Sequence, residues 1–166
     1  MKPFRRRRDG ALHAVFTREE AEVVVALAAE TGALAEAARS GTADPDDPAL
    51  QRLLPDAYPD DTAASAEFRR FTADGLAERK ILNARRVMES LARGSGDRVD
   101  VRLDEQEAAA WLRAITDIRL ALAVRLGITQ DGDVGEIVDD EAAYRRAVYD
   151  WLAYVQETLV MALRGR

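Results

Sequence analysis

The sequence offers little for catalysis, and its one histidine, His13, is the side chain best suited to general-base chemistry. An imidazole can activate a serine hydroxyl when a carboxylate orients it, as in a Ser-His-Asp triad. The sequence contains no nucleophile-elbow motif to mark such a serine, and neither a Walker A nor a dinucleotide-binding motif. We therefore expect no catalytic site.

The sequence also lacks a complete metal-binding motif and any side chain that could carry out thiol chemistry. The chain contains no cysteine, so it cannot form disulfides, thiolate metal sites or thiol redox switches. The acidic turn 131–136 partly resembles a calcium loop, but the EF-hand template requires glycine at position six and glutamate at position twelve. Those positions hold Glu136 and Ala142, and we expect neither a metal nor a cofactor.

Paired carboxylates, which could act as a general acid and a general base, stand mainly where helices are predicted to begin. Thr17 with Glu20 forms a capping box, and Asp104 with Glu107 forms an acidic variant of it. Carboxylates at these positions accept hydrogen bonds from free backbone N–H groups and complement the helix dipole. We assign them a capping role.

Asp117 and Arg119 are the most unusual charges, because they lie within residues 108–128, a stretch that is apolar on nearly every side. Burying a charge is costly unless it is paired and hydrogen-bonded. Arg70 lies near the apolar stripe of the preceding predicted helix, so we expect an internal pair between Asp117 and an arginine, Arg70 or Arg119. A small-ligand pocket near Asp117 and Arg119 is the alternative.

Two groups of basic residues could contact an acidic partner. Within the run Arg5 to Arg8, we expect Arg6 and Arg8 on the solvent face of a predicted strand. We interpret that strand first as an edge guarded by charge. A contact for an acidic protein is the second interpretation, and weak nucleic-acid binding, with few aromatics for stacking, is the third. The second group covers an arc of about 120° on one predicted helix and consists of Arg69, Arg79, Lys80 and Arg86.

The first predicted element is a β-hairpin over residues 3–16. Asp9-Gly10 favours a two-residue type I′ turn. An isolated hairpin is only marginally stable, and the alternating run 99–103 is expected to add a third antiparallel strand. In the predicted register the opposed residues are Arg8 with Ala11, Arg6 with His13, and Phe4 with Val15.

Apolar residues recur at helical spacing in four further segments. They predict helices from Thr17 to about residue 39, from Asp61 to about residue 93, from Asp104 to about residue 128, and from residue 139 or 140 to about residue 162. An acidic, proline-rich connection spans residues 41–61. The sequence therefore predicts one α-rich α+β domain over residues 1–166, with a four-helix core and a small antiparallel sheet. The inner stripe predicted for the fourth helix is Tyr144, Val148, Trp151, Val155, Leu159 and Ala162.

Composition limits the class of protein further. Hydrophobic residues make up 48% and charged residues 33% of the chain, as in a folded soluble domain. The net charge of −6 argues against nucleic-acid binding by the surface as a whole. No apolar stretch reaches membrane-spanning length, and none follows the basic start as in a signal peptide, so we expect a cytoplasmic protein.

Several segments resemble an actinobacterial protein family of unknown function. They are residues 52–61, Glu67-Phe68-Arg69, Trp111-Leu112, residues 117–120 and residues 125–128. One described branch of that family, AosR, is an oxidative-stress regulator that acts with a stress sigma factor, and family genes often lie beside the gene for the Clp adaptor ClpS. The resemblance implies a regulatory or adaptor protein whose partner is transcription machinery or a Clp-associated protein. Redox sensing through cysteines, attributed to that branch, cannot transfer to this cysteine-free chain.

Residues and resemblance together predict a non-enzymatic regulatory or adaptor protein that acts through protein–protein contacts. A small-ligand-binding helical domain with its pocket near Asp117 is the alternative. Weak nucleic-acid binding through the arginine hairpin is the third hypothesis.

Overall fold

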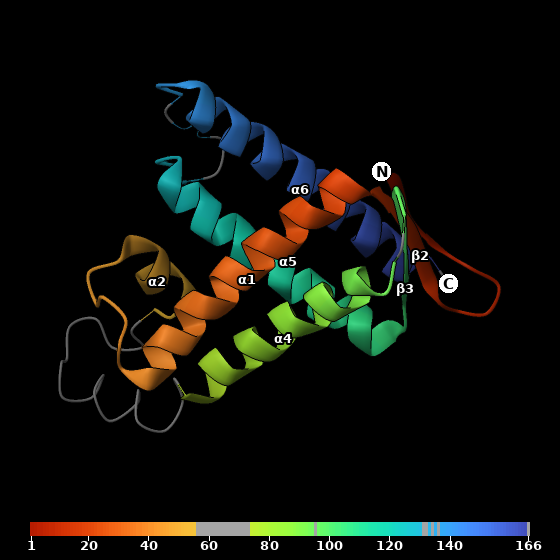
Figure 1. Cartoon of the computed structure of the whole chain (residues 1–166), viewed down its shortest axis with the longest axis horizontal. Coiled ribbons are helices and arrows are strands. Elements are labelled where there is room, and N and C mark those ends of the chain that lie inside the picture. Colours follow the sequence, from red (N-terminus) through yellow and green to blue (C-terminus); the bar gives the residue numbers. More distant parts are fainter. Residues whose placement is uncertain (56–73, 95, 131–132, 134, 136, 166) are drawn as a thin grey trace.

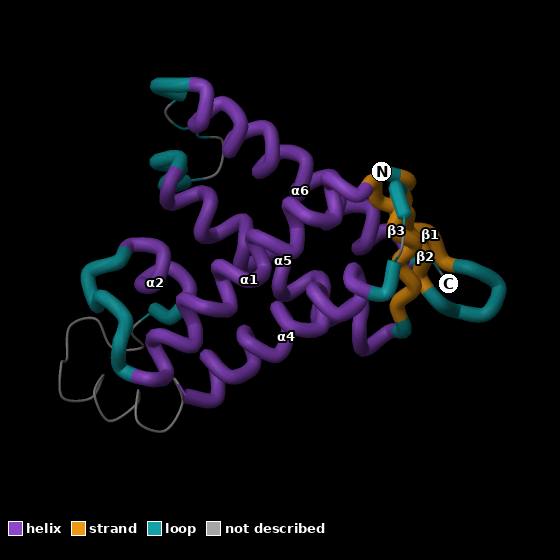
Figure 2. Tube along the Cα trace, viewed as in Figure 1, coloured by secondary structure: helices purple, strands orange, loops and turns teal. Residues whose placement is uncertain are grey.

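The computed structural model describes residues 1–55, 74–94, 96–130, 133, 135 and 137–165. Long helices extend from one side of a three-stranded antiparallel sheet of order β1-β2-β3 (Figure 1). Figure 2 shows the sheet gathered at one end of the molecule. The predicted α-rich α+β fold is confirmed. The elements in chain order are β1 (Lys2–Arg6), β2 (Leu12–Thr17), α1 (Arg18–Ser40), α2 (Pro48–Leu53), α4 (Asp74–Ala92), β3 (Arg98–Leu103), α5 (Glu105–Arg125) and α6 (Asp140–Arg164).

The helix ends follow from local sequence. Thr17 and Glu20 form the predicted capping box at the start of α1, and Asp104 and Glu107 form another at the start of α5. Gly41 ends α1 in the left-handed conformation, with φ 72°, which glycine adopts at no steric cost. The capping side chains and the Gly41 N–H, which donates to the backbone oxygens of Ala37 and Ala38, satisfy groups that a helix end otherwise leaves unpaired.

The predicted register of the hairpin is wrong by one residue. Arg6 lies opposite Leu12 and Arg5 opposite His13. Gly10 has a positive φ of 83° but Asp9 does not, whereas a type I′ turn needs a positive φ at both positions. Asp9 Oδ1 instead accepts a hydrogen bond from the Ala11 N–H at 3.1 Å, in a longer loop.

A register shift of one residue moves every side chain of a strand to the other face of the sheet. Phe4 and Arg6 therefore turn toward the helices, the reverse of the prediction for Arg6, and Arg5 turns toward solvent. The third strand is present as predicted, with Val101 opposite Ala14. It contributes alternating exposed and buried residues.

The core joins the inner face of the sheet to α5 through a cluster of aromatic rings. Trp111 is fully buried, and its ring centroid lies 5.6 Å from that of Phe4 and 5.8 Å from that of Phe16. The Trp111 indole N–H donates a hydrogen bond to Ser90 Oγ at 2.9 Å, which satisfies a polar group that burial would otherwise penalise. Sheet and helices thus share one core.

The helical segments differ from the prediction in three details. A short helix, α2, lies within the acidic connection and packs against α5. Residues 61–73, where the second predicted helix begins, lie outside the described residues. In α6, Leu152 is buried whereas Tyr144 is 58% exposed, so Tyr144 was wrongly assigned to the inner stripe. No helix in the described part of the chain is both long and apolar enough to span a membrane.

Candidate functional site

A groove of about 660 Å³ lies between α4 and α5, and we call it the α4/α5 groove. Its volume falls in the range of about 300–1,000 Å³ that is usual for ligand pockets. The groove is lined by Leu76, Arg79, Lys80, Leu82, Asn83, Arg86, Leu112, Arg113, Thr116 and Asp117.

Helix α4 forms one wall with residues that recur three and four positions apart. Arg79, Leu82 and Arg86 share one side of the helix, while Ala77 and Ala84 on another side are buried. Both arginines are exposed, and Leu82 is 46% exposed. This wall therefore presents an uncovered leucine between two guanidinium groups.

Helix α5 forms the opposite wall with Leu112, Arg113 and Thr116. Leu112 is half-buried and Arg113 is exposed. Thr116 Oγ1 donates a hydrogen bond to the backbone oxygen of Leu112 at 2.8 Å, so its hydroxyl is turned onto its own helix. The two walls together line one groove with leucines and with three exposed arginines, Arg79, Arg86 and Arg113, which we call its rim.

The floor of the groove holds an ion pair between Lys80 and Asp117. Lys80 Nζ lies 2.5 Å from Asp117 Oδ1, with 14% and 10% of the two side-chain surfaces exposed. Burial raises the pKa of the Asp117 carboxyl, and the ammonium of Lys80 acts against that rise. Lys80 is thus an internal counterion and not part of the open surface for which it was predicted.

The rim arginines are the charged groups of the groove that remain unpaired among the described residues. Arg79, Arg86 and Arg113 have no hydrogen-bond or ion-pair partner within the described ranges. A guanidinium group binds carboxylates through two parallel hydrogen bonds. The groove can therefore hold apolar groups at its centre and carboxylates at its edge.

Arg119 does not pair with Asp117. Its guanidinium donates to Gln156 Oε1 at 2.6 Å and lies over the ring of Tyr149, 4.7 Å from the centroid. The expectation that an arginine neutralises Asp117 is thus wrong for Arg119, and Arg70 and Arg69 lie outside the described residues. The predicted helical arc contributes Arg79 and Arg86 to the groove rim.

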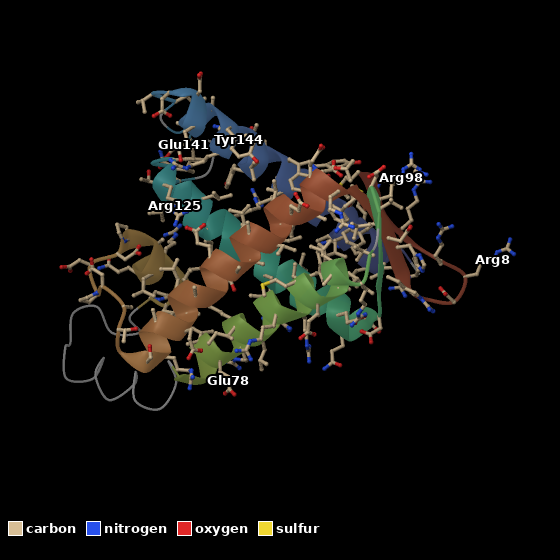
Figure 3. All side chains as sticks on the ribbon, viewed as in Figure 1. Arg8, Glu78, Arg98, Arg125, Glu141 and Tyr144 are labelled. Atoms are coloured by element: carbon tan, nitrogen blue, oxygen red, sulfur yellow. The ribbon has the colours of Figure 1, made fainter. Side chains whose placement is uncertain are left out.

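The hairpin arginines of the predicted partner surface separate into two roles. Arg6 is half-buried, and its Nε and Nη2 atoms donate to the backbone oxygens of Ala162 (3.2 Å) and Leu163 (3.3 Å) at the end of α6. It therefore caps a helix and is not free for a partner. Arg8 is exposed in the hairpin loop, at the sheet end of the molecule (Figure 3).

Sequence reasoning missed Arg113 and Leu82 as members of one site. Arg113 was visible as a charge in an otherwise apolar segment, and Leu82 as an apolar residue off the main stripe of its helix. Neither signal predicted that the two would line the same groove. Among the residues that the structure describes, no three His, Cys, Asp or Glu side chains are grouped so as to hold a metal ion.

Comparison with known proteins identifies a family of unknown function and relatives that are named as oxidative stress regulators. A family model described as "Domain of unknown function (DUF2017)" matches residues 1–163. A protein of Mycobacterium tuberculosis named "Oxidative stress regulator AosR" is 37% identical over 133 residues, covering 73% of this chain and 60% of that relative. The protein of the same name from Mycobacterium bovis matches equally well. No solved structure matches the chain.

Proposed function

The chain belongs to the DUF2017 family. We propose that it is a non-enzymatic regulator in an oxidative stress response. It would act by binding another protein in the α4/α5 groove. The matched region spans only about 60% of the length of the AosR relatives. Their role is therefore carried to this chain as a proposal. A cytoplasmic location is part of the same proposal.

One observation supports the groove as the binding surface: three arginines without described partners surround an exposed leucine. Protein interfaces have an apolar centre and a polar rim, and arginine is enriched at the positions that carry most of the binding energy. Arg79, Arg86 and Arg113 form such a rim around Leu82. The partner that fits has an apolar ridge flanked by carboxylates.

The absence of cysteine shapes how such a regulator would respond to an oxidant. This chain cannot switch by forming a disulfide or a sulfenic acid. We propose that the redox signal arrives through the partner, whose oxidation state would decide whether it occupies the groove. Peroxide should then alter complex formation only when the partner is the oxidised component.

Small-ligand binding is the second candidate, and the volume of the groove supports it. A pocket with apolar walls and a few polar groups is typical of a ligand site, and Asp117 lies in the floor. A carboxylate already paired with Lys80 offers little binding capacity of its own. The exposed arginines at the rim therefore favour a larger, acidic partner.

The test is affinity capture from the native lysate with a matched set of charge reversals. The groove variant carries Arg86→Glu and Arg113→Glu, and the control carries Arg52→Glu and Arg164→Glu on the exposed surfaces of α2 and α6. Mass spectrometry should find a protein retained by wild type and control but lost from the groove variant. Transcription components and Clp-associated proteins are the first classes to examine.

Two results would contradict the proposal. One is capture of the same proteins by the groove variant and by wild type. The other is a mass-spectrometric signal for a co-purified small molecule, displaced by Leu82→Arg, with no captured protein. That second result would establish the ligand-binding alternative.

A further inference from the structure

The solvent face of the sheet carries a second set of basic side chains, separate from the α4/α5 groove. Alternate residues of each strand point away from the helices, and those of the edge strands are exposed. Figure 3 shows Arg98 on β3 and Arg8 in the hairpin loop at this end of the molecule. We call this surface the basic sheet face, formed by Lys2, Arg5, Arg7, Arg8, Arg98 and Arg102.

The pairing of the strands sets the spacing of these charges. Arg5 of β1 and Arg102 of β3 both lie opposite His13 of the central strand. Neighbouring strands are about 4.8 Å apart, so the backbones of the two arginines are separated by about 10 Å. Lys2 and Asp100 flank Val15 in the adjacent row.

Among the described residues of the three strands and the hairpin loop, Asp9 and Asp100 are the carboxylates, against the six cations of the basic sheet face. Asp9 Oδ2 accepts a hydrogen bond from Arg102 Nη2 at 3.0 Å, and Asp100 is the second carboxylate. Among the described residues, no side-chain hydrogen bond or ion pair is formed by Arg5, Arg7, Arg8 or Arg98; only their backbone groups are bonded. The excess is positive although the whole chain carries a net charge of −6.

This face lacks the apolar centre that a protein interface requires. Val15, in the middle strand, is half-buried, and the large apolar side chains of the strands point the other way. Phe4 and Phe16 are 3% and 0% exposed, packed on Trp111. They are unavailable to stack on unpaired bases, which is how single-stranded nucleic acid is usually held.

From this combination we infer that the basic sheet face binds the phosphate backbone of a nucleic-acid duplex without reading its sequence. Charge without apolar or aromatic groups is sufficient for backbone contact, whose free energy comes from counterion release. The inference does not rest on the groove or on its protein partner. Either proposal can therefore fail alone.

The test is fluorescence anisotropy with a labelled 20-base-pair DNA duplex of mixed sequence, titrated with the full chain. Binding is expected in the range of about 10⁻⁴–10⁻⁶ M, typical of non-specific contact. It should weaken steeply as salt rises from about 50 to 200 mM, because each phosphate contact adds about 0.9 to the slope of log K against log salt.

Two double variants localise the binding. Arg8→Glu with Arg98→Glu should lower affinity at least tenfold and reduce the salt slope by about 1.8. The groove variant Arg86→Glu with Arg113→Glu changes the net charge equally and should bind the duplex nearly as wild type does. Circular dichroism of both variants checks that the fold is intact.

Four outcomes would overturn the inference. They are no binding of the duplex at 50 mM salt, equal loss in the two double variants, tighter binding to the same sequence as a single strand, and tighter binding to a poly-glutamate peptide. The second would mean that only net charge matters. The last would assign the face to an acidic protein.

Discussion

The basic sheet face and the α4/α5 groove are both cationic, yet they are built in different ways. On the sheet, Arg98 and Arg102 flank Asp100 along β3 and lie opposite Thr17 and His13. In the groove, Arg79 and Arg86 lie beside the exposed Leu82 and across from Leu112. Both surfaces carry arginines, but the side chains between the arginines are mainly polar on the sheet and apolar in the groove.

A count of basic residues would not separate the two surfaces, because it ignores the groups between the charges. Charge alone attracts any polyanion and is weakened by salt, whereas charge around an apolar patch adds a contribution from burial that salt leaves in place. The sheet face should therefore bind weakly and with strong salt dependence. The groove should bind one partner more tightly, with a weaker dependence on salt.

The largest expected loss of stability comes from removing the aromatic contact between the sheet and α5. Trp111 connects the inner face of the sheet to α5, and replacing it with alanine removes a fully buried ring. Trp111→Ala should lower the free energy of unfolding by about 3–5 kcal/mol, measured by urea denaturation. Trp111→Phe is the control, and it should cost less because it loses mainly the hydrogen bond to Ser90. A mild effect of Trp111→Ala would mean that sheet and helices are held together elsewhere.

The next effect separates the groove floor from its rim. Asp117→Ala leaves the ammonium of Lys80 without its counterion, and should cost about 3 kcal/mol of unfolding free energy. Replacing both partners, with Lys80→Met and Asp117→Leu, should return stability to within about 1 kcal/mol of wild type, because no unpaired charge remains. If the double variant is as unstable as Asp117→Ala, the loss of stability comes from altered side-chain packing and not from an unpaired charge.

A smaller effect distinguishes two neighbouring arginines of β1. Arg6 donates to two backbone oxygens at the end of α6, whereas Arg5 is exposed on the basic sheet face. Arg6→Ala should lower stability by about 1.5 kcal/mol, and Arg5→Ala by less than about 0.5 kcal/mol. Thermal unfolding of both variants gives the comparison. Reversed magnitudes would support the hairpin register expected from Asp9-Gly10.

The smallest effect is a pH dependence that belongs to the groove alone. The pKa of Asp117 is raised on folding, chiefly by burial, so the folded protein binds a proton at this carboxyl more readily than the unfolded chain does. The cost of its ionised form is present above the folded pKa and disappears as pH falls through it toward 3.8. The stability of wild type relative to Asp117→Asn should therefore improve from pH 7 to about 4, as followed by urea midpoints. A relative loss of stability over this range would show that Lys80 outweighs burial.

Much of the fold was predictable because the relevant signals are local. Thr17 with Glu20 and Asp104 with Glu107 lie within one helical turn, so their caps depend on nothing distant. Alternation in residues 99–103 likewise predicts a strand with one buried face. That Asp117 needs a counterion also follows from its apolar neighbours.

The hairpin register, the counterion and the groove required the tertiary structure. Asp9-Gly10 suits more than one loop length, and the register observed is the one in which Phe4 packs on Trp111. Lys80 and Asp117 are 37 residues apart in the chain. They meet because of how α4 and α5 are rotated and packed against each other. Local hydrogen bonds and periodicity determine where helices and strands form, but the facing of their side chains depends on which packing buries the most apolar surface. The elements therefore follow from local sequence, whereas the pairing of charges, their exposure and the groups between them follow from how the elements pack.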